Sequence, residues 1–327
     1  MKIKGMTPAR AGIVFTIIIV ISIGVSFFVS LLAWRGDSLQ LSLFQDLFLS
    51  EGIVLVPALL MATVCGAEVG EIFRFKKIKI STCLLTVLFM ICMEPLISLV
   101  NSISLLFTDN MALKIAEEFI TQDTSFISLA VAMAVIGPLA EELAFRGVIY
   151  AGLRRSGRLL GAILLQALLF GLMHLNFNQM SYAFVLGVAW GILNEVTGSL
   201  WPGLIGHFMI NIGGAISGFA LVKYFPDALE MEYSANDLLV SIAFNAMLAV
   251  LFTGFAVLLL IRIAANEPGG KFRLIRIFRG HDLKVITKDG REELIKRPPV
   301  FSVPVVFGII LALVEMIGIL VLQMQVS

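Results

Sequence analysis

Charged side chains are scarce in this sequence. Asp, Glu, Lys and Arg together make up 14% of its 327 residues, whereas hydrophobic residues make up 59%. So few polar groups cannot cover the surface of a soluble globular protein of this length. The net charge is only +1, and the basic residues lie in short segments between apolar runs, which excludes a basic face for nucleic acid. We therefore predict an integral membrane protein that has the lipid bilayer, and no nucleic acid, as a partner.

Cysteine is also rare. Cys65, Cys83 and Cys92 all fall within apolar runs, and none forms a Cys-x-x-Cys pair. This odd number and spacing indicate neither a disulfide framework nor a zinc knuckle, so we interpret the three as small core residues. The chain also lacks an internal repeat, a low-complexity tract and a separate soluble domain. No small-x-small cleavage site follows the first apolar run, which we predict to be a retained span.

Apolar runs of spanning length are abundant. A helix needs about 20 mostly apolar residues to span a bilayer. Nine segments are candidates, namely 11–34, 52–70, 81–107, 126–153, 159–175, 182–197, 200–222, 238–265 and 300–324. The predicted fold class is all-α, a polytopic transmembrane helical bundle of nine spans. Eight spans are the alternative, because only Thr197-Gly198-Ser199 separates the sixth and seventh segments, which can form a re-entrant or broken pair.

The basic residues indicate the orientation, because cytoplasmic loops carry an excess of Lys and Arg. Basic residues precede the first span and fill the even-numbered gaps: Lys2, Lys4, Arg10, Arg74, Lys76, Lys77, Lys79, Arg154, Arg155 and Arg158. The other gaps are acidic, at Asp37, Asp46, Glu51, Asp109, Glu117, Glu118, Asp123, Asp227, Glu230, Glu232 and Asp237. We expect a multi-pass protein of a bacterial plasma membrane with a cytoplasmic N-terminus.

We divide the chain into three parts. Residues 1–125 are N-terminal transmembrane helices, 126–222 are a transmembrane core, and 223–327 are C-terminal helices with a basic cytoplasmic loop at 266–299. The loop is expected to rest on anionic lipid headgroups. Its Asp289-Gly290 turn, flanked by the segments KVIT and REELI, favours a small β-hairpin.

Ionisable residues inside an apolar run give the strongest functional signal. The segment 137–147, GPLAEELAFRG, holds Glu141, Glu142 and Arg146. Such groups are costly at bilayer depth unless they find partners or water, so they mark a functional site by default. On a helix, Glu142 and Arg146 share a face, whereas Glu141 points about 100° away. We expect Arg146 to hold Glu142 ionised and to leave Glu141 free to act as a base or a ligand.

Two histidines lie in equally apolar surroundings. His174 follows Phe170 by one helical turn, and Asn211 follows His207 by one turn, so that its amide can fix the His207 tautomer. At 1.5 Å per residue, Glu141, Glu142 and His174 lie about 18–22 Å above the inner ends of their helices. His207 lies only about 10 Å above Leu200 on the same rise. It is therefore predicted to lie lower, unless 198–206 enters as a broken helix.

A carboxylate and two imidazoles in a dry cavity suit two routes of amide hydrolysis. In the first, Glu141 acts as general base on a water that His174 helps to polarise. In the second, Glu141, His174 and His207 hold a divalent metal, with zinc the expected ion, and the remaining glutamate takes the proton of the water. The residues alone leave both routes open.

The same motifs resemble those of the CPBP family of intramembrane proteases, which comprises the type II CAAX prenyl endopeptidases and the Abi bacteriocin-processing or immunity proteins. The EExxxR motif of the family matches Glu141 to Arg146, its FxxxH motif matches Phe170 to His174, and its HxxxN motif matches His207 to Asn211. The resemblance covers about residues 135–215.

This resemblance implies an all-helical catalytic core at 126–222. It implies an endopeptidase that hydrolyses a peptide bond of a membrane-associated peptide or protein. The site residues carried over are Glu141, Glu142, Arg146, His174, His207 and Asn211. It leaves open whether a metal or the glutamate alone activates water, and it does not imply specificity for CAAX sequences.

Two other functions are alternatives. A secondary transporter or proton relay also uses intramembrane carboxylates and histidines, although the missing inverted repeat and the clustering of the polar residues disfavour it. A non-catalytic immunity or scaffold protein would have lost the use of these residues, yet all of the motif residues are present.

Overall fold

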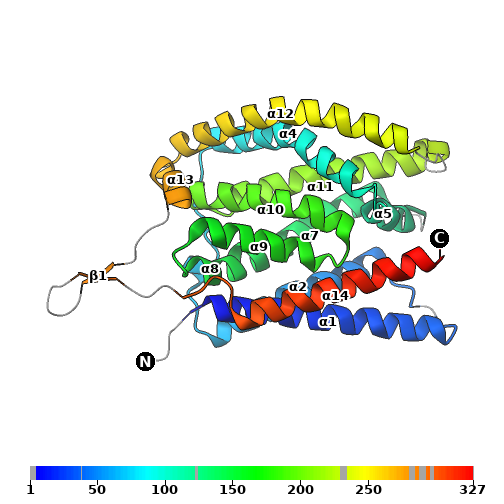
Figure 1. Cartoon of the computed structure of the whole chain (residues 1–327), viewed down its shortest axis with the longest axis horizontal. Coiled ribbons are helices and arrows are strands. Elements are labelled where there is room, and N and C mark those ends of the chain that lie inside the picture. The colour runs from blue at the N-terminus through cyan, green and yellow to red at the C-terminus, as the bar shows by residue number, and fades with distance from the viewer. Residues whose placement is uncertain are drawn as a thin grey trace.

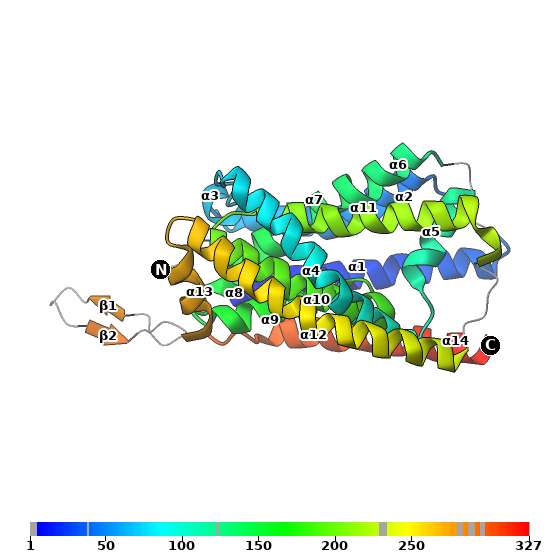
Figure 2. The same cartoon turned by 90° about the horizontal axis from the view of Figure 1, so that it is seen from above.

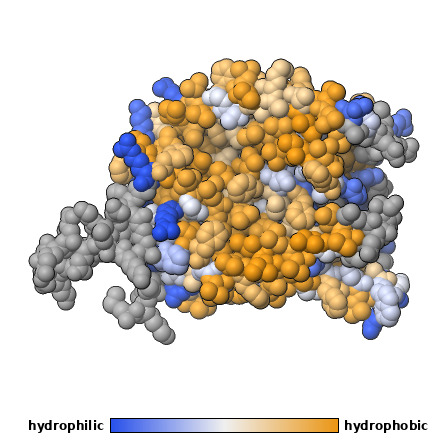
Figure 3. Space-filling model, in the orientation of Figure 1, coloured by the Kyte–Doolittle hydropathy of each residue, from blue (hydrophilic) through white to orange (hydrophobic). Residues whose placement is uncertain are grey.

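A computed structural model describes residues 5–37, 39–121, 124–228, 234–279, 284–286, 292–294 and 298–326. The chain forms a bundle of long helices, with the N-terminus, α8 and α13 at one end and α5 at the other (Figures 1 and 2). Among the described residues, seven helices are long and apolar enough to cross a membrane. Apolar residues cover most of the face in Figure 3. The all-α transmembrane fold is thus confirmed; Lys2, Lys4, Asp123, Glu230, Glu232 and the Asp289-Gly290 turn lie outside the described residues.

The first part of the chain comprises α1 (Pro8–Trp34), α2 (Leu43–Val64), α3 (Val69–Ile72), α4 (Ile80–Ser104) and α5 (Met111–Thr121). Helix α2 begins well before the predicted start at residue 52. The side chain of Gln45 accepts a hydrogen bond of 3.0 Å from the backbone N–H of Ser42, which caps the helix at that point. Asp46 and Glu51, which were predicted to lie in an outer gap, are therefore part of α2.

The span at Phe126–Arg154 is one continuous rod of five pieces. It consists of α6 (Phe126–Val131), the π-helical η1 (Ala132–Ile136), α7 (Gly137–Glu142), the π-helical η2 (Leu143–Ile149) and α8 (Tyr150–Arg154). The two π segments widen the helix on both sides of α7. Such widened turns occur often at functional sites, and α7 is the piece that ends in the two glutamates.

The middle of the bundle is formed by α9 (Leu159–Met173), α10 (Phe177–Thr197) and α11 (Trp201–Tyr224). Helix α9 has only 15 residues, and it packs closely against α10 in the interior (Figure 1). The nine apolar segments predicted from the sequence all coincide with helical rods, but α9 and α10 are not among the seven long apolar ones. The number of spans stays a prediction.

The last part comprises η3 (Pro226–Ala228), α12 (Ala235–Asn266), α13 (Gly270–Arg279), β1 (Lys284–Ile286), β2 (Glu292–Leu294) and α14 (Val303–Val326). Strands β1 and β2 pair antiparallel with Val285 opposite Glu293, so the strands of the predicted hairpin are confirmed. Helix α12 lies along α4, and α14 lies along α1 (Figures 1 and 2). A Cβ on Gly12 would approach the backbone of Val305 to 2.7 Å, so this glycine permits the close contact of α1 and α14.

Candidate functional site

The predicted pair of Glu142 and Arg146 is present. Arg146 Nη1 lies 3.0 Å from Glu142 Oε1, and both side chains are fully buried. The guanidinium also faces two aromatic rings, with its Cζ 4.1 Å from the ring centre of Phe170 and 5.1 Å from that of Trp190. Cation–π contacts of this kind add to the ion pair in a dry site. Arg146 thus holds Glu142 in place from within the same rod.

His207 contacts both glutamates directly. Its Nε2 lies 3.3 Å from Glu141 Oε2, and its Nδ1 lies 3.4 Å from Glu142 Oε1. The imidazole stacks on the ring of Trp190, with centroids 4.1 Å apart. His207 therefore lies level with the glutamates, and the prediction from helix rise that it lies lower is wrong.

The start of α11 explains this difference. The turn between α10 and α11 is buried, with Ser199 and Leu200 fully shielded, rather than resting at the membrane surface. The backbone N–H of Leu200 donates to the carbonyl of Arg74, and the hydroxyl of Ser199 donates to the carbonyl of Lys76. Arg273 on α13 donates to the carbonyl of Thr197 from the same end. Since these groups cover the turn, α11 begins inside the protein and carries His207 to the depth of the glutamates.

His174 caps the end of α9 at the turn into α10. Its backbone carbonyl accepts a hydrogen bond of 2.9 Å from the Asn176 amide. The next residue, Leu175, has a φ of 52°, a left-handed conformation that is uncommon for residues other than glycine. The Phe170 ring centre lies 5.4 Å from that of His174 and 5.9 Å from that of His207. Phe170 therefore contacts both imidazoles.

The side chain of Asn211 does not form the predicted hydrogen bond with His207. Its amide donates a hydrogen bond of 2.7 Å to the carbonyl of Met133 in η1, and no hydrogen bond joins it to His207 in the described part of the chain. The N–H of Gly137 donates to Ala132, and Pro138 has no N–H to offer. The Met133 carbonyl therefore lacks a donor within its own helix, and Asn211 supplies one. The expectation that Asn211 fixes the His207 tautomer is corrected, because carboxylates face both nitrogens of His207.

Three further residues belong to the site although no motif identified them. Asn194 donates to Glu142 Oε2 at 3.4 Å and accepts from the N–H of Gly203 at 2.8 Å. Trp190 supports His207 by stacking. Glu51 on α2 has a buried Oε2 without a partner among the described residues, and its Oε1 would lie 3.4 Å from a Cβ on Gly137, at the start of α7. Asn194 and Glu51 were visible only as polar residues in or beside apolar runs.

The expected metal ligands do not fit a metal in this arrangement. Among the described residues, no group of three or more His, Cys, Asp or Glu side chains is placed so that it could hold an ion. Each nitrogen of His207 already faces a carboxylate oxygen within 3.4 Å, so neither has an open direction.

Comparisons with known proteins single out the same region. Residues 123–213 match the family described as type II CAAX prenyl endopeptidase Rce1-like. A Bacillus subtilis (strain 168) protein named "Putative membrane peptidase YdiL" is 24% identical over 83 residues, which are 25% of this chain and 34% of that protein. The chain thus spans about a third of the length of this curated relative. No solved structure matches the chain.

The matched residues include all three sequence motifs, and the fold brings Glu141, Glu142, Arg146 and His207 together. Residues 123–213 are therefore similar to the type II CAAX prenyl endopeptidases of the Rce1-like family.

Proposed function

We propose that the protein is an intramembrane endopeptidase that cleaves a membrane-associated peptide or protein. The observation that carries the proposal is the convergence of Glu141 and Glu142 on the two nitrogens of one buried imidazole, His207. The relatives support the same class of activity. A buried group of this kind serves acid–base chemistry, because burial makes the position of each proton decisive.

The contacts of His207 support a proton that is shared within the site. A neutral imidazole donates from one nitrogen and accepts at the other. With a carboxylate at each nitrogen, either His207 is protonated or one glutamate is. Because Arg146 pairs with Glu142 at 3.0 Å, we assign the shared proton to Glu141 and His207. These two groups form an acid–base pair that is ready to exchange a proton with a substrate or a water.

The proposed hydrolysis uses this pair. With its proton on His207, the Glu141 carboxylate removes a proton from a water while the water oxygen attacks the carbonyl carbon of the scissile peptide bond. The π electrons of the carbonyl move to its oxygen and form a tetrahedral intermediate. When the intermediate collapses, the C–N bond breaks and the leaving nitrogen takes the proton from Glu141. Water is the only co-reactant, and the site ends in its starting protonation state.

Other residues position this machinery. His174, half-buried at the end of α9, is proposed to donate to the carbonyl oxygen as negative charge develops on it. Trp190 and Phe170 hold the imidazoles, and Asn211 anchors α11 to η1 next to α7. We also infer a cytoplasmic N-terminal end, because the basic residues gather there.

The substitution Glu141→Gln tests the proposal. Amide and carboxylate have nearly the same shape, but the amide cannot accept the proton, so cleavage should fall by roughly 10²–10⁴-fold. Wild-type protein and variant are reconstituted with a mixture of membrane peptides, and new N-termini are counted by mass spectrometry. Glu315→Gln is the matched control, because Glu315 lies on α14, which packs against α1 and α9. If Glu141→Gln and the wild type yield the same new N-termini, the proposal is wrong.

A second arm addresses the metal. Because the three expected ligands are not arranged to hold an ion, we expect cleavage to persist after exhaustive dialysis against a chelator. Metal content is measured on the same sample by mass spectrometry. Loss of cleavage that returns on addition of zinc would establish the metal route, with Glu141, His174 and His207 as its ligands.

A further inference from the structure

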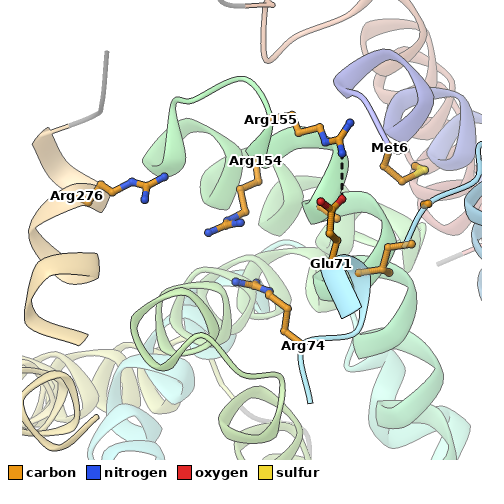
Figure 4. A pocket seen from close by; sticks show the side chains of 9 residues that line it. Met6, Glu71, Arg74, Arg154, Arg155 and Arg276 are labelled. Carbon is orange, nitrogen blue, oxygen red and sulfur yellow. Dashed lines mark hydrogen bonds and ion pairs between the residues drawn. The ribbon is translucent and has the colours of Figure 1, made fainter. Parts of the chain in front are cut away.

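A second polar site lies at the end of the bundle that carries the N-terminus. A pocket of about 210 Å³ opens there between the first residues of the chain, α3, α8 and α13. Four arginines line it, Arg74, Arg154, Arg155 and Arg276, together with Glu71 (Figure 4). The whole of η2 separates α8 from the glutamates of α7, so this pocket is distinct from the candidate active site.

The arginines outnumber the carboxylates that neutralise them. Arg154 binds Glu195 through two hydrogen bonds of 2.9 Å, and Arg74 Nη1 donates to the same carboxylate at 3.1 Å. Arg155 pairs with Glu71 at 3.0 Å. Among the described residues, the guanidinium groups of Arg74 and Arg154 therefore share one carboxylate, and no carboxylate pairs with Arg276, which gives this part of the pocket wall an excess of positive charge.

Two of the arginines keep buried donors that nothing in the described part of the chain satisfies. These are Nη2 of Arg74, a residue that is only 8% exposed, and Nε of Arg276. A buried donor of a charged group is costly to leave without an acceptor. Figure 4 shows the side chains of Arg74, Arg154 and Arg276 directed toward one another across the pocket. Such a convergence favours a ligand with several oxygens and a negative charge.

We propose that this pocket binds a phosphate group. Guanidinium groups bind phosphate through paired, charge-assisted hydrogen bonds, and a pocket of about 210 Å³ is large compared with the roughly 30 Å³ that one water takes up. The phosphate can come from a lipid headgroup or from a free phosphate in solution, and both sources offer the same oxygens to the arginines.

The surroundings place the pocket at headgroup level. Helix α13 exposes Phe272, Ile275 and Phe278, three large apolar side chains that recur at every third residue and so share one face. Lys271 and Arg279 are also exposed on α13, and a short helix that exposes both apolar and basic residues is suited to the membrane interface. Arg276 on the same helix is thereby held where lipid phosphates are, in a basic pocket of the type that binds anionic headgroups.

The substitution Arg276→Gln tests the proposal on the full chain. It removes the charge and the unpartnered donor, and it breaks no ion pair between described residues. Arg279→Gln is the matched control, because it makes the same change on the exposed part of α13 and does not line the pocket. Protein is reconstituted in phosphatidylcholine nanodiscs with or without phosphatidic acid or phosphatidylglycerol. Retained lipid is measured by native mass spectrometry, and thermal unfolding is followed with inorganic phosphate against chloride at equal ionic strength.

Binding should weaken on the order of tenfold to a hundredfold in Arg276→Gln, because one charge-assisted hydrogen bond is lost, and it should be unchanged in Arg279→Gln. Retention of an anionic lipid by the wild type with this pattern supports the lipid source. Stabilisation by inorganic phosphate with the same pattern supports the free phosphate. If neither probe binds, or if both variants lose binding equally, the pocket has no phosphate site and the proposal is overturned.

Discussion

At the scale of single residues, the charged side chains in the apolar rod of residues 126–154 have polar partners. Glu142 has Arg146 and Asn194 as partners, and Glu141 has His207. A buried charge that loses its partner is strongly destabilising, whereas a paired one is tolerated. The polar residues that the sequence contributes at this depth are therefore mutually dependent.

Arg146→Met should destabilise the protein by about 3–5 kcal/mol, because it leaves Glu142 buried without its cation. The thermal unfolding midpoint in detergent is the measurement, with Arg158→Met as control at an exposed position. The double variant Glu142→Gln with Arg146→Met should recover part of the loss, since it removes the orphaned charge. Equal midpoints for Arg146→Met and Arg158→Met would contradict a stabilising ion pair.

At the scale of elements, small residues let α10 and α11 approach each other beside α7. A Cβ on Gly203 would lie 2.5 Å from Asn194 Nδ2 and 2.7 Å from Glu142 Oε2, and one on Gly206 would lie 2.7 Å from Trp190 Nε1. Real side chains do not reach such distances. The two glycines in the first turns of α11 thus allow its backbone to lie close to these polar groups.

Gly203→Ala should displace Asn194 and Glu142 and lower peptide cleavage at least tenfold, since small misplacements of catalytic groups have large effects on rate. Gly213→Ala on the same helix is the control, because a Cβ there meets open space. That control should keep its activity and gain slightly in stability, as alanine favours a helix over glycine by about 1 kcal/mol. Cleavage rates and unfolding midpoints are measured side by side; equal rates for the two variants would show that the contact is not critical.

At the scale of the whole molecule, arginines gather at one end of the bundle. Arg74, Arg154, Arg155 and Arg276 line the pocket at the end that carries the N-terminus. At the opposite end, where α5 lies (Figure 2), Asp109 pairs with Lys114. From the positive-inside rule, we expect the end with the arginine pocket to face the cytoplasm.

Labelling of single cysteines checks this orientation. In a background with Cys65, Cys83 and Cys92 replaced by alanine, a cysteine at position 109 should react with an impermeant maleimide added to intact cells. A cysteine at position 158, in the turn between α8 and α9, should react only after the membrane is opened. The reverse pattern would place the basic end outside and would overturn the predicted orientation.

The sequence by itself determined the fold class, the helical segments, the pairing of Glu142 with Arg146 and the family motifs, because these depend on local hydropathy and on helical spacing. Tertiary structure decided the rest. The depth of His207 depends on a buried turn held by Arg74, Lys76 and Arg273, which are distant in the sequence.

The hydrogen bond of Asn211 depends on a carbonyl that a π turn and a proline leave without a donor. Glu51 and Asn194 reach the site only through the packing of α2 and α10 beside the rod of residues 126–154. Periodicity fixes which side chains share a helix face, but only packing between helices decides which faces meet and at what depth.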